Sequence, residues 1–400
     1  MDSVQYLLSI ETRGIKLGLQ RTRELMAACG NPQAGLPSIQ VACTNGKGSV
    51  CAMLANIFKT AGYKPGLFTS PHLVNVNERI RLNGIPIPNN EIDLFLQNYR
   101  EAIEKLEATF FETITAMAFW YFKNKNVDIA ILETGLGGRL DSVSVCEPLA
   151  TVMTSISLDH IEILGETLSE IAFEKAGILK KGVPCISAKQ DNVVEEVLVK
   201  EGQRINAPIH FVNDKFPSEL IVNIPGTTQL ENAQLAVSAL KYINNFEIQK
   251  TALKNGLQTV QWFARNQHIQ HNPLVIFDVA HNVESIQSFL EYYSSLGITG
   301  KSVLIIALQS RKHIQPLVST LQKVFEYIIC TEAPGRNPMP AKVLGEYFTN
   351  KNQFEIIPNT EKAIRLGLEK LKSQDGMAII GSHCLGPGVS KVFKISFDKY

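Results

Sequence analysis

The stretch "CTNGKGSV", residues 43–50, places a lysine between two glycines directly after the apolar residues 39–42. Glycines let successive backbone amides point at one anion, and Lys47 and the start of a following helix would add positive charge. The general nucleotide-binding loop reads G-x-x-x-x-G-K-[ST], whereas here Val41 stands at the first glycine and Gly48 precedes the serine. A plain strand-to-helix turn with a solvated lysine explains the stretch equally well. The candidate phosphate-binding residues are Thr44, Asn45, Gly46, Lys47, Gly48 and Ser49.

Polar residues also follow two further apolar stretches. Ser70 precedes a Pro-His pair, and Glu133 closes an apolar run and leads into the glycine-rich "TGLGGRLD". A carboxylate at the end of a buried strand suits a divalent cation, because Mg²⁺ prefers oxygen ligands. A helix cap or salt bridge for Glu133, and an ordinary turn for the glycines, remain open alternatives.

Histidines and a lysine complete the set of chemically capable residues. His160 follows a fourth apolar stretch, Lys175 lies in "EKAGI", and Asp278 and His281 lie in "FDVAHN". A single histidine is more often structural than a ligand, and a helix lysine is usually solvated. Five expected strand ends that all carry polar residues nevertheless indicate a ligand site, because ligands of parallel α/β sheets bind beyond the carboxyl ends of the strands.

The elements that would position these residues alternate between short β-branched runs and longer amphipathic segments. This alternation predicts parallel sheets covered by helices, with helices expected at 49–61 and 112–123. A polar stretch without periodicity at 265–272 reads as a linker between two α/β domains, residues 1–264 and 273–400. The predicted strands are 38–42, 64–68, 129–133, 150–155 and 184–187 in the first domain, and 274–279, 302–307, 327–331, 354–357 and 377–381 in the second.

Composition restricts the class of protein. The 400 residues are 45% hydrophobic and 19% charged, which is typical of a globular protein. A net charge of +1 gives no global attraction to nucleic acid or to an anionic membrane. Seven cysteines without C-x-x-C spacing favour reduced thiols, and no apolar run is long enough to span a bilayer. We therefore expect a cytoplasmic protein that acts on small molecules.

Taken together, these stretches resemble the folylpolyglutamate synthase/dihydrofolate synthase family, within the Mur-type ATP-dependent amide ligases. The resemblance covers most of the chain and is carried by "LGLQRTRELMAACGNPQ", "VACTNGKGS", "FTSPHL", "ERIRLNG", "FFETITAMAF", "LETGLGGRLD", "TSISLDHIEILGETLSEIAFEKAGILK", "FDVAHN" and "IIGSHCLG". It implies a P-loop-type, mostly parallel sheet ATPase domain, followed by a smaller Rossmann-like α/β domain.

The resemblance also implies roles for individual residues. The catalytic residues would be Lys47, Lys175, His160 and His281, with Lys175 matching a lysine that is carbamylated in this family. The ATP-binding residues would be Thr44 to Ser49 together with Asn232, Arg265 and Asp278. The folate- or pteroate-binding residues would be Thr109, Phe110, Phe111, Glu112, Leu140, Asp141 and Ser142. The metal ligands would be Ser70, Glu133 and His160.

The implied reaction adds L-glutamate to dihydropteroate, to the glutamate tail of tetrahydrofolate, or to both. ATP is the co-substrate and Mg²⁺ the metal ion, with room for a monovalent cation such as K⁺. A substrate carboxylate would attack the γ-phosphate to give an acyl phosphate, and the glutamate amine would then displace phosphate. The resemblance further implies a monomer without nucleic-acid or membrane partners.

The sequence departs from the family pattern at several places. Cys43 stands where the family has glycine; a positive φ there would strain the loop, and we expect an extended conformation instead. Glutamine replaces histidine at Gln40, "SVSV" at 142–145 replaces a Thr-Asn pair, and "WFAR" replaces W-x-G-R. The segment "LQSRKHI" at 308–314 stands where relatives have an Asp-Lys-Asp segment.

Two other functions remain open. One is a Mur-type ligase that acts on another substrate, such as a peptidoglycan precursor, against which "TSPHL" and "GLGGRLD" speak. The other is a nucleotide- or folate-binding homologue with impaired catalysis, suggested by Cys43 and by the altered segment 142–145.

Overall fold

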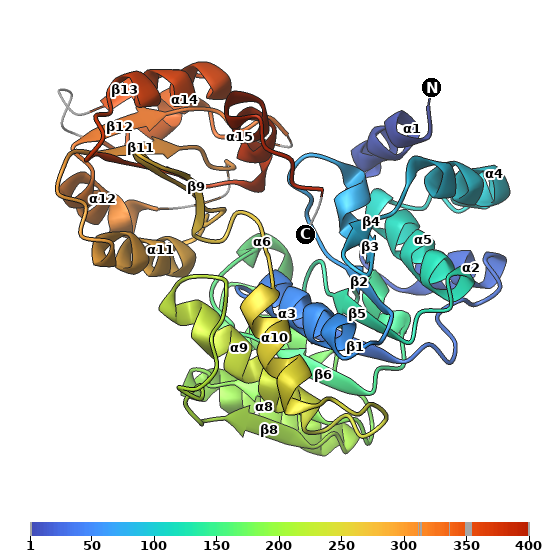
Figure 1. Cartoon of the computed structure of the whole chain (residues 1–400). Helices are drawn as coiled ribbons and strands as arrows, with labels where there is room; N and C mark the ends of the chain where they lie inside the picture. The colour runs from blue at the N-terminus through green and yellow to red at the C-terminus, as the bar shows by residue number, and fades with distance from the viewer. Residues whose placement is uncertain (1, 311, 313, 336, 349–353, 399–400) are drawn as a thin grey trace. The chain divides into compact units, whose positions relative to one another are not determined.

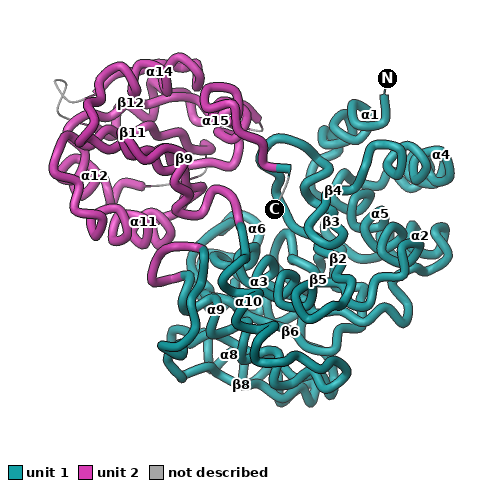
Figure 2. The backbone as a smooth tube through the Cα atoms, in the orientation of Figure 1, with its two compact units in different colours: residues 1–223, 229–261, 398–400 teal, residues 224–228, 262–397 magenta. Residues whose placement is uncertain are grey.

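The chain forms two compact units, each with a sheet of its own (Figure 2). The computed structural model describes all residues except 1, 311, 313, 336, 349–353 and 399–400. The first unit comprises residues 1–223, 229–261 and 398–400, and the second comprises residues 224–228 and 262–397.

The first unit is organised around an eight-stranded sheet in the order β4-β3-β2-β5-β1-β6-β7-β8. Six of these strands, β2, β5, β1, β6, β7 and β8, run parallel to one another, whereas β3 and β4 add an antiparallel edge. The strands are β1 (Ser38–Ala42), β2 (Pro65–Phe68), β3 (Ile80–Leu82), β4 (Ile85–Pro86), β5 (Ile129–Glu133), β6 (Ala150–Met153), β7 (Cys185–Ala188) and β8 (Ile209–Val212).

Helices cover this sheet and supply its core (Figure 1). Helix α3 packs on β1, β2 and β5, and α10 packs on α3 so closely that a Cβ on Gly256 would lie 2.7 Å from the Cα of Ile57. Another core cluster joins α1, α2, α4 and α5 to β2 and β5. The helices are α1 (Ser3–Ser9), α2 (Gln20–Ala28), α3 (Lys47–Thr60), α4 (Asn89–Lys105), α5 (Phe110–Asn124), α6 (Ile161–Leu164), α7 (Leu168–Ala176), α8 (Asn192–Ile205), α9 (Thr227–Leu240) and α10 (Lys250–Thr259).

The second unit has a six-stranded sheet in the order β13-β12-β11-β14-β10-β9, parallel except for the β9–β10 pair. Its strands are β9 (Gln267–His271), β10 (Leu274–Phe277), β11 (Ser302–Ile306), β12 (Tyr327–Cys330), β13 (Phe354–Ile356) and β14 (Gly376–Ile380). Its helices are α11 (Val283–Ser295), α12 (Val318–Val324), α13 (Ala341–Gly345), α14 (Thr360–Glu369) and α15 (Gly386–Phe393).

The ten strands predicted from the sequence are all present, with ends that differ by at most two residues, whereas β3, β4 and β8 were not predicted. The predicted linker at 265–272 is different: residues 267–271 form strand β9, which pairs with β10. The division between the units falls at 261/262, a few residues before the predicted end of the first domain, and residues 224–228 join the second unit. Of the altered segment 308–314, residues 311 and 313 lie outside the described part of the chain.

Candidate active site

Four neighbouring parallel strands of the first unit bring the candidate residues to one edge of the sheet. The strands lie in the order β2-β5-β1-β6, so their carboxyl ends face the same way. Ser70 follows β2, Glu133 ends β5, Lys47 follows β1, and His160 follows β6. The register places Glu133 beside Val41.

The candidate phosphate-binding loop, residues 43–49, is called the phosphate loop below and is fixed to the neighbouring loop after β6. The Thr44 amide donates to the Ser155 carbonyl at 2.9 Å, and the Ser157 amide donates to the Thr44 hydroxyl at 3.1 Å. Gly46, with φ 88°, is the N-cap of α3, so the first turn of this helix presents its amides to the loop. The Lys47 ammonium donates to the carbonyls of Cys43 and Thr44, each at 2.9 Å.

Two hydroxyls beside this loop are buried without a hydrogen-bond partner in the described structure. They are Ser49 Oγ, in the first turn of α3, and Ser157 Oγ, in the loop after β6. Because a buried unpaired hydroxyl is costly, such atoms at a loop of this kind fit an oxygen-rich ligand that completes their hydrogen bonds.

Cys43 does not adopt the extended conformation expected from the sequence: its φ is 121°. Side chains with a Cβ rarely adopt this region, and Cys43 is also buried. Ala264, the residue at the glycine position of W-x-G-R, likewise has a positive φ of 55°. The backbone therefore keeps a glycine-like conformation at both positions although the side chains have changed.

Asn232 of α9 lies against the phosphate loop. A Cβ placed on Gly46 would meet Asn232 Oδ1 at 2.3 Å, and together with the positive φ this favours glycine at this position of the loop. The buried amide of Asn232 is oriented by its own helix, since its Nδ2 donates to Gln229 Oε1 at 3.2 Å. The structure thus brings together two candidate ATP-binding segments that are far apart in the sequence.

The three candidate metal ligands are only partly assembled. Glu133 is buried, and its Oε2 accepts the Ser70 amide at 3.0 Å. His160 is exposed and has a left-handed φ of 52°, and its amide donates to Asp159 Oδ1 at 2.8 Å. Among the described residues no three His, Cys, Asp or Glu side chains form a metal cluster. A cation here would need water or phosphate oxygens as further ligands, which is typical of Mg²⁺.

Lys175, near the end of α7, is buried and surrounded by other candidate residues. Burial, with a further contribution from the charge of Lys47, lowers the pKa of its ammonium to about 8, while the carboxylates of Asp159 and Asp141 oppose that shift. The glycine-rich loop approaches α7 so closely here that a Cβ added to Gly138 would lie 2.7 Å from the Lys175 carbonyl oxygen. Lys175 is therefore not a solvated helix lysine.

Asp141 holds the glycine-rich loop together. Its Oδ2 accepts the amides of Gly135 and Leu136 at 2.9 and 2.8 Å, and its Oδ1 accepts the Val143 amide at 2.9 Å. Its neighbour Ser142 is buried and accepts a hydrogen bond from the Thr22 hydroxyl at 3.0 Å. Of the three candidate folate-binding residues in this loop, only Leu140 has a partly exposed side chain.

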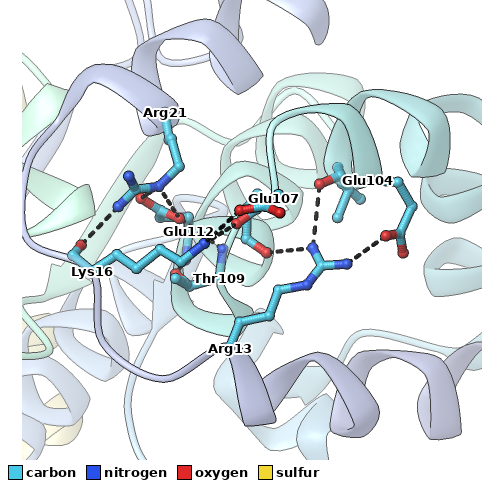
Figure 3. Close-up of polar contacts among 9 residues, drawn as sticks. Arg13, Lys16, Arg21, Glu104, Glu107, Thr109 and Glu112 are labelled. Carbon is cyan, nitrogen blue, oxygen red and sulfur yellow. Dashed lines mark hydrogen bonds and ion pairs between the residues drawn. The ribbon is translucent and has the colours of Figure 1, made fainter.

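The other candidate folate-binding segment caps helix α5 (Figure 3). Thr109 is the N-cap, and the Glu112 carboxylate accepts the Thr109 amide at 2.7 Å and the Arg21 Nε at 3.1 Å. Phe110 is buried, whereas Phe111 is half-buried and lies against Gly135 of the glycine-rich loop. Phe111 is thus the aromatic side chain of this segment that can contact a ligand.

The remaining candidate residues belong to the second unit. The buried Asp278 accepts the amides of Asn266 and Ala280 at 2.6 and 2.7 Å. Burial raises the pKa of its carboxyl, and the guanidinium of Arg265 acts against that rise. His281 donates from Nδ1 to the Val279 carbonyl at 2.8 Å. Arg265, Asp278 and His281 therefore gather at the end of β10.

Sequence reasoning missed a buried polar network beneath the site. Gln40 in β1 donates from Nε2 to the hydroxyls of Ser144 and Thr134, at 2.9 and 3.3 Å. Ser144 in turn donates to the Gly138 carbonyl at 2.6 Å. A glutamine inside an otherwise apolar strand was the signal for this network.

Comparison with known protein families agrees with this geometry. The Mur ligase middle domain model matches residues 41–240, and the Mur ligase glutamate ligase domain model matches residues 264–383. The dihydrofolate synthase/folylpolyglutamate synthase of Bacillus subtilis is 35% identical over 343 residues, covering 78% of this chain and 80% of that protein. The chain belongs to the folylpolyglutamate synthase/dihydrofolate synthase family of Mur ligases.

Other relatives of this family match along nearly the whole chain. The Escherichia coli dihydrofolate synthase/folylpolyglutamate synthase is 30% identical, covering 95% of this chain and 92% of that protein. The structure of E. coli FolC in complex with DHPP and ADP superposes with a TM-score of 0.90 at 28% identity, covering 98% of each chain. A Yersinia pestis enzyme complexed with AMPPNP and Mn ion gives a TM-score of 0.89 at 26% identity, covering 99% of this chain and 98% of that one.

Two expectations about fold and environment can also be compared with the structure. The two α/β units, each with a mostly parallel sheet, confirm the predicted fold class. Within the described residues, no helix is both long and apolar enough to cross a membrane.

Proposed function

We propose that this chain uses ATP to join L-glutamate to dihydropteroate, to the glutamate tail of tetrahydrofolate, or to both. The observation that carries this proposal is the gathering of Lys47, Glu133 and Lys175 at one sheet edge, beside two buried hydroxyls that lack partners. Membership of the folylpolyglutamate synthase/dihydrofolate synthase family supports the choice of substrates.

In this proposal the phosphate loop holds the β- and γ-phosphates of ATP. The Lys47 ammonium already lies at the loop, where two carbonyls hold it. It can exchange these acceptors for phosphate oxygens and so stabilise the charge that develops during transfer. The Ser49 hydroxyl and the amides in the first turn of α3 would add hydrogen bonds to the same oxygens, and Asn232 closes the loop from the opposite side.

Ser70, Glu133 and His160 are the residues that would hold Mg²⁺, which would neutralise charge on the phosphates. The buried carboxylate of Glu133, which accepts the Ser70 amide, fixes the position of this ligand set. Lys175 supplies an amine whose pKa of about 8 leaves a larger neutral fraction at physiological pH than an exposed lysine has. The neutral amine is the form that adds CO₂, so we also propose that Lys175 is carbamylated.

The reaction would then proceed in two steps. A substrate carboxylate attacks the γ-phosphorus, ADP leaves, and an acyl phosphate forms. The amine of L-glutamate attacks the acyl carbon, and the amide forms as phosphate leaves. Phe111 and Leu140, the partly exposed members of the candidate folate segments, would contact the acceptor, while Thr109, Glu112 and Asp141 hold those segments in shape.

Further elements of the proposal rest on the resemblance and on the balanced charge of the chain. The protein would act as a cytoplasmic monomer on small molecules, without nucleic-acid or membrane partners. Mg²⁺ would be its metal ion, with a monovalent cation such as K⁺ as an accessory.

Phosphate release measured with 7,8-dihydropteroate and tetrahydrofolate in parallel, each with and without L-glutamate, tests this function. We expect release that requires both the acceptor and glutamate. Lys47→Ala should lower the turnover rate by a factor on the order of 10²–10³, because a positioned charge on the phosphates is lost. Lys59→Ala, which removes an exposed lysine from the last turn of the same helix, is the matched control and should keep turnover.

Two results would count against this function. Nucleotide binding without acceptor-dependent phosphate release would indicate a binding homologue with impaired catalysis. Release that depends on a UDP-muramyl peptide rather than on a pteroate would indicate a ligase for another substrate.

A further inference from the structure

A pocket in the first unit, at the opposite ends of the strands from the phosphate loop, suggests a second site. The pocket has a volume of about 710 Å³. Its walls come from segments that enter three adjacent parallel strands: residues 31 and 33 precede β1, residues 144–148 precede β6, and residues 180–183 precede β7. It therefore lies at the amino ends of the strands, and we call it the amino-edge pocket.

The amino-edge pocket is separate from the phosphate loop. Lys47 and Glu133 lie at the carboxyl ends of these strands, and a five-residue strand is roughly 17 Å long. A ligand in the pocket would therefore not be the ATP bound at the phosphate loop. The volume is within the range of roughly 300–1,000 Å³ that small-molecule sites occupy.

The charges in the pocket favour an anion. Arg23, Lys180 and Lys181 line it, against the single carboxylate of Glu147. Lys180 is held in place, since its ammonium donates to the Ser144 carbonyl at 2.8 Å. Arg23 and Lys181 are exposed, and in the described structure neither side chain has an ion-pair partner. Three cations that share one carboxylate create a positive potential, which an anion would relieve.

The rest of the lining favours a ligand with an apolar part. Cys146 is buried, with 2% of its surface exposed, and it lines the pocket with Val145, Pro148 and Val183. Asn31 and Gln33, whose side chains carry amides that can form hydrogen bonds, also line the pocket. Small-molecule sites commonly combine an apolar surface with a few polar groups in this way.

The pocket also adjoins the glycine-rich loop through a short chain of hydrogen bonds. Lys180 donates to the Ser144 carbonyl, and the Ser144 hydroxyl donates to the carbonyl of Gly138. The same hydroxyl accepts a hydrogen bond from Nε2 of Gln40, which lies in the central strand β1. The cations of the pocket are thus attached to a segment that shapes the active site.

We propose that the amino-edge pocket binds a small organic anion. Its phosphate or carboxylate group lies between Arg23 and Lys181, and its apolar group lies on Cys146, Pro148 and Val183. This ligand is distinct from the ATP and the acceptor of the ligase reaction, because the pocket lies at the opposite ends of the strands from Lys47 and Glu133.

Calorimetric titration with four small probes tests this inference. Phenyl phosphate and isophthalate carry both an anionic and an aromatic part, inorganic phosphate is only anionic, and phenol is only aromatic. We expect at least one of the first two to bind about tenfold more tightly than inorganic phosphate and phenol, which identifies the preferred anionic group. The double variant R23Q/K181Q should weaken that binding by at least about tenfold, since both charge-assisted contacts are lost.

Two matched variants locate the binding. Lys200→Gln removes an exposed lysine of α8 that does not line the pocket, and it should leave the affinity unchanged. Lys47→Ala should also leave it unchanged, because the phosphate loop is a different site. Three results would overturn the proposal: binding that survives R23Q/K181Q but is lost in Lys47→Ala, inorganic phosphate that binds as tightly as the aromatic anions, or no binding of either aromatic anion.

Discussion

Cys43 shows how a single residue can conflict with the backbone conformation that its loop requires. At a φ of 121° the Cβ is crowded by the main chain, which costs about 1–3 kcal/mol. The Cys43 carbonyl nevertheless accepts the Lys47 ammonium, and the side chain packs in the buried cluster beneath α7. These contacts hold the loop in its conformation despite the strain at Cys43.

Comparing Cys43→Ala with Cys43→Gly isolates this strain. Both variants lose the Sγ atom, but only the glycine also loses the Cβ. We expect the glycine variant to have the higher free energy of unfolding, by about 1–2 kcal/mol, in denaturant titrations. At an unstrained position the same comparison favours alanine by about 0.5–1 kcal/mol, so a more stable alanine variant would exclude strain at this residue.

The lowered pKa of Lys175 should make the stability of the protein depend on pH in the alkaline range. The pKa of Lys175 is about 8 in the folded protein, against an ordinary value of 10.5 for a lysine. Between these two values the unfolded chain keeps a proton that the folded chain has released, so the unfolded state binds more protons and stability rises with pH. The gain begins near pH 8 and is complete near pH 10.5.

Subtracting the free energy of unfolding of a variant without this lysine cancels the contributions of the other titrating groups. In CO₂-free buffer, the free energy of unfolding of the wild type minus that of Lys175→Met should rise from pH 8 to pH 10.5. Added bicarbonate should extend the rise below pH 8 if the folded amine becomes a carbamate, since the unfolded chain still binds the ammonium proton that the carbamate lacks. Parallel pH profiles of the two proteins in CO₂-free buffer would mean that Lys175 has an ordinary pKa.

At the scale of elements, Thr109 and Glu112, which the resemblance predicts to bind folate, form the N-terminal cap of helix α5. The Thr109 hydroxyl accepts the Glu112 amide, and the Glu112 carboxylate accepts the Thr109 amide in return. Arg21 adds a charge-assisted contact to the same carboxylate (Figure 3). These contacts hold the start of α5, and with it Phe111, against the glycine-rich loop.

Replacing the cap should therefore affect stability first. Thr109→Ala is expected to lower the free energy of unfolding by about 1 kcal/mol, measured by denaturant titration, because the Glu112 amide loses its acceptor. Thr109→Ser keeps the hydroxyl and should stay within about 0.5 kcal/mol of the wild type. A Thr109→Ala protein with unchanged stability but weaker pteroate binding would instead make the hydroxyl a ligand contact.

At the scale of the whole molecule, each unit has a buried core and buried cysteines of its own. Cys330 is buried in the same core cluster of the second unit as Phe325, and Cys185 is buried in the first unit. Domains with separate cores can open separately. All seven cysteines are free thiols, so they can report where the chain opens.

Core truncations should expose one cysteine at a time. Phe325→Ala removes a fully buried ring that packs on Tyr293, at a cost of about 3–5 kcal/mol. Thiol labelling read by mass spectrometry should then accelerate at Cys330 by a factor on the order of 10²–10³, and not at Cys185. Phe122→Ala, in the first unit, is the matched variant and should do the reverse. Equal acceleration at both cysteines in either variant would indicate that the whole chain unfolds as one unit.

The sequence by itself determined the central strands of both sheets and the residues at their ends, but not β3, β4, β8 or β9. Short β-branched runs are strong local signals, and polar residues that follow them mark the edge where a parallel sheet binds ligands. The family motifs added the substrate class. Strand β9 was missed because its residues, "QHIQH", are polar except for Ile269 and do not alternate, so they resemble a linker, and the segment becomes a strand only by pairing with β10.

Only the tertiary structure decided what the side chains at that edge do. Whether Asp141 contacts a ligand or closes a loop depends on backbone amides that fold back onto it, and whether Lys175 is solvated depends on its burial beside Lys47. The positive φ of Cys43 and the cations of the amino-edge pocket likewise arise from segments that meet only in the folded chain. Strand formation follows from residues near one another in the sequence, whereas burial and electrostatic environment come from contacts between distant segments, which local patterns do not encode.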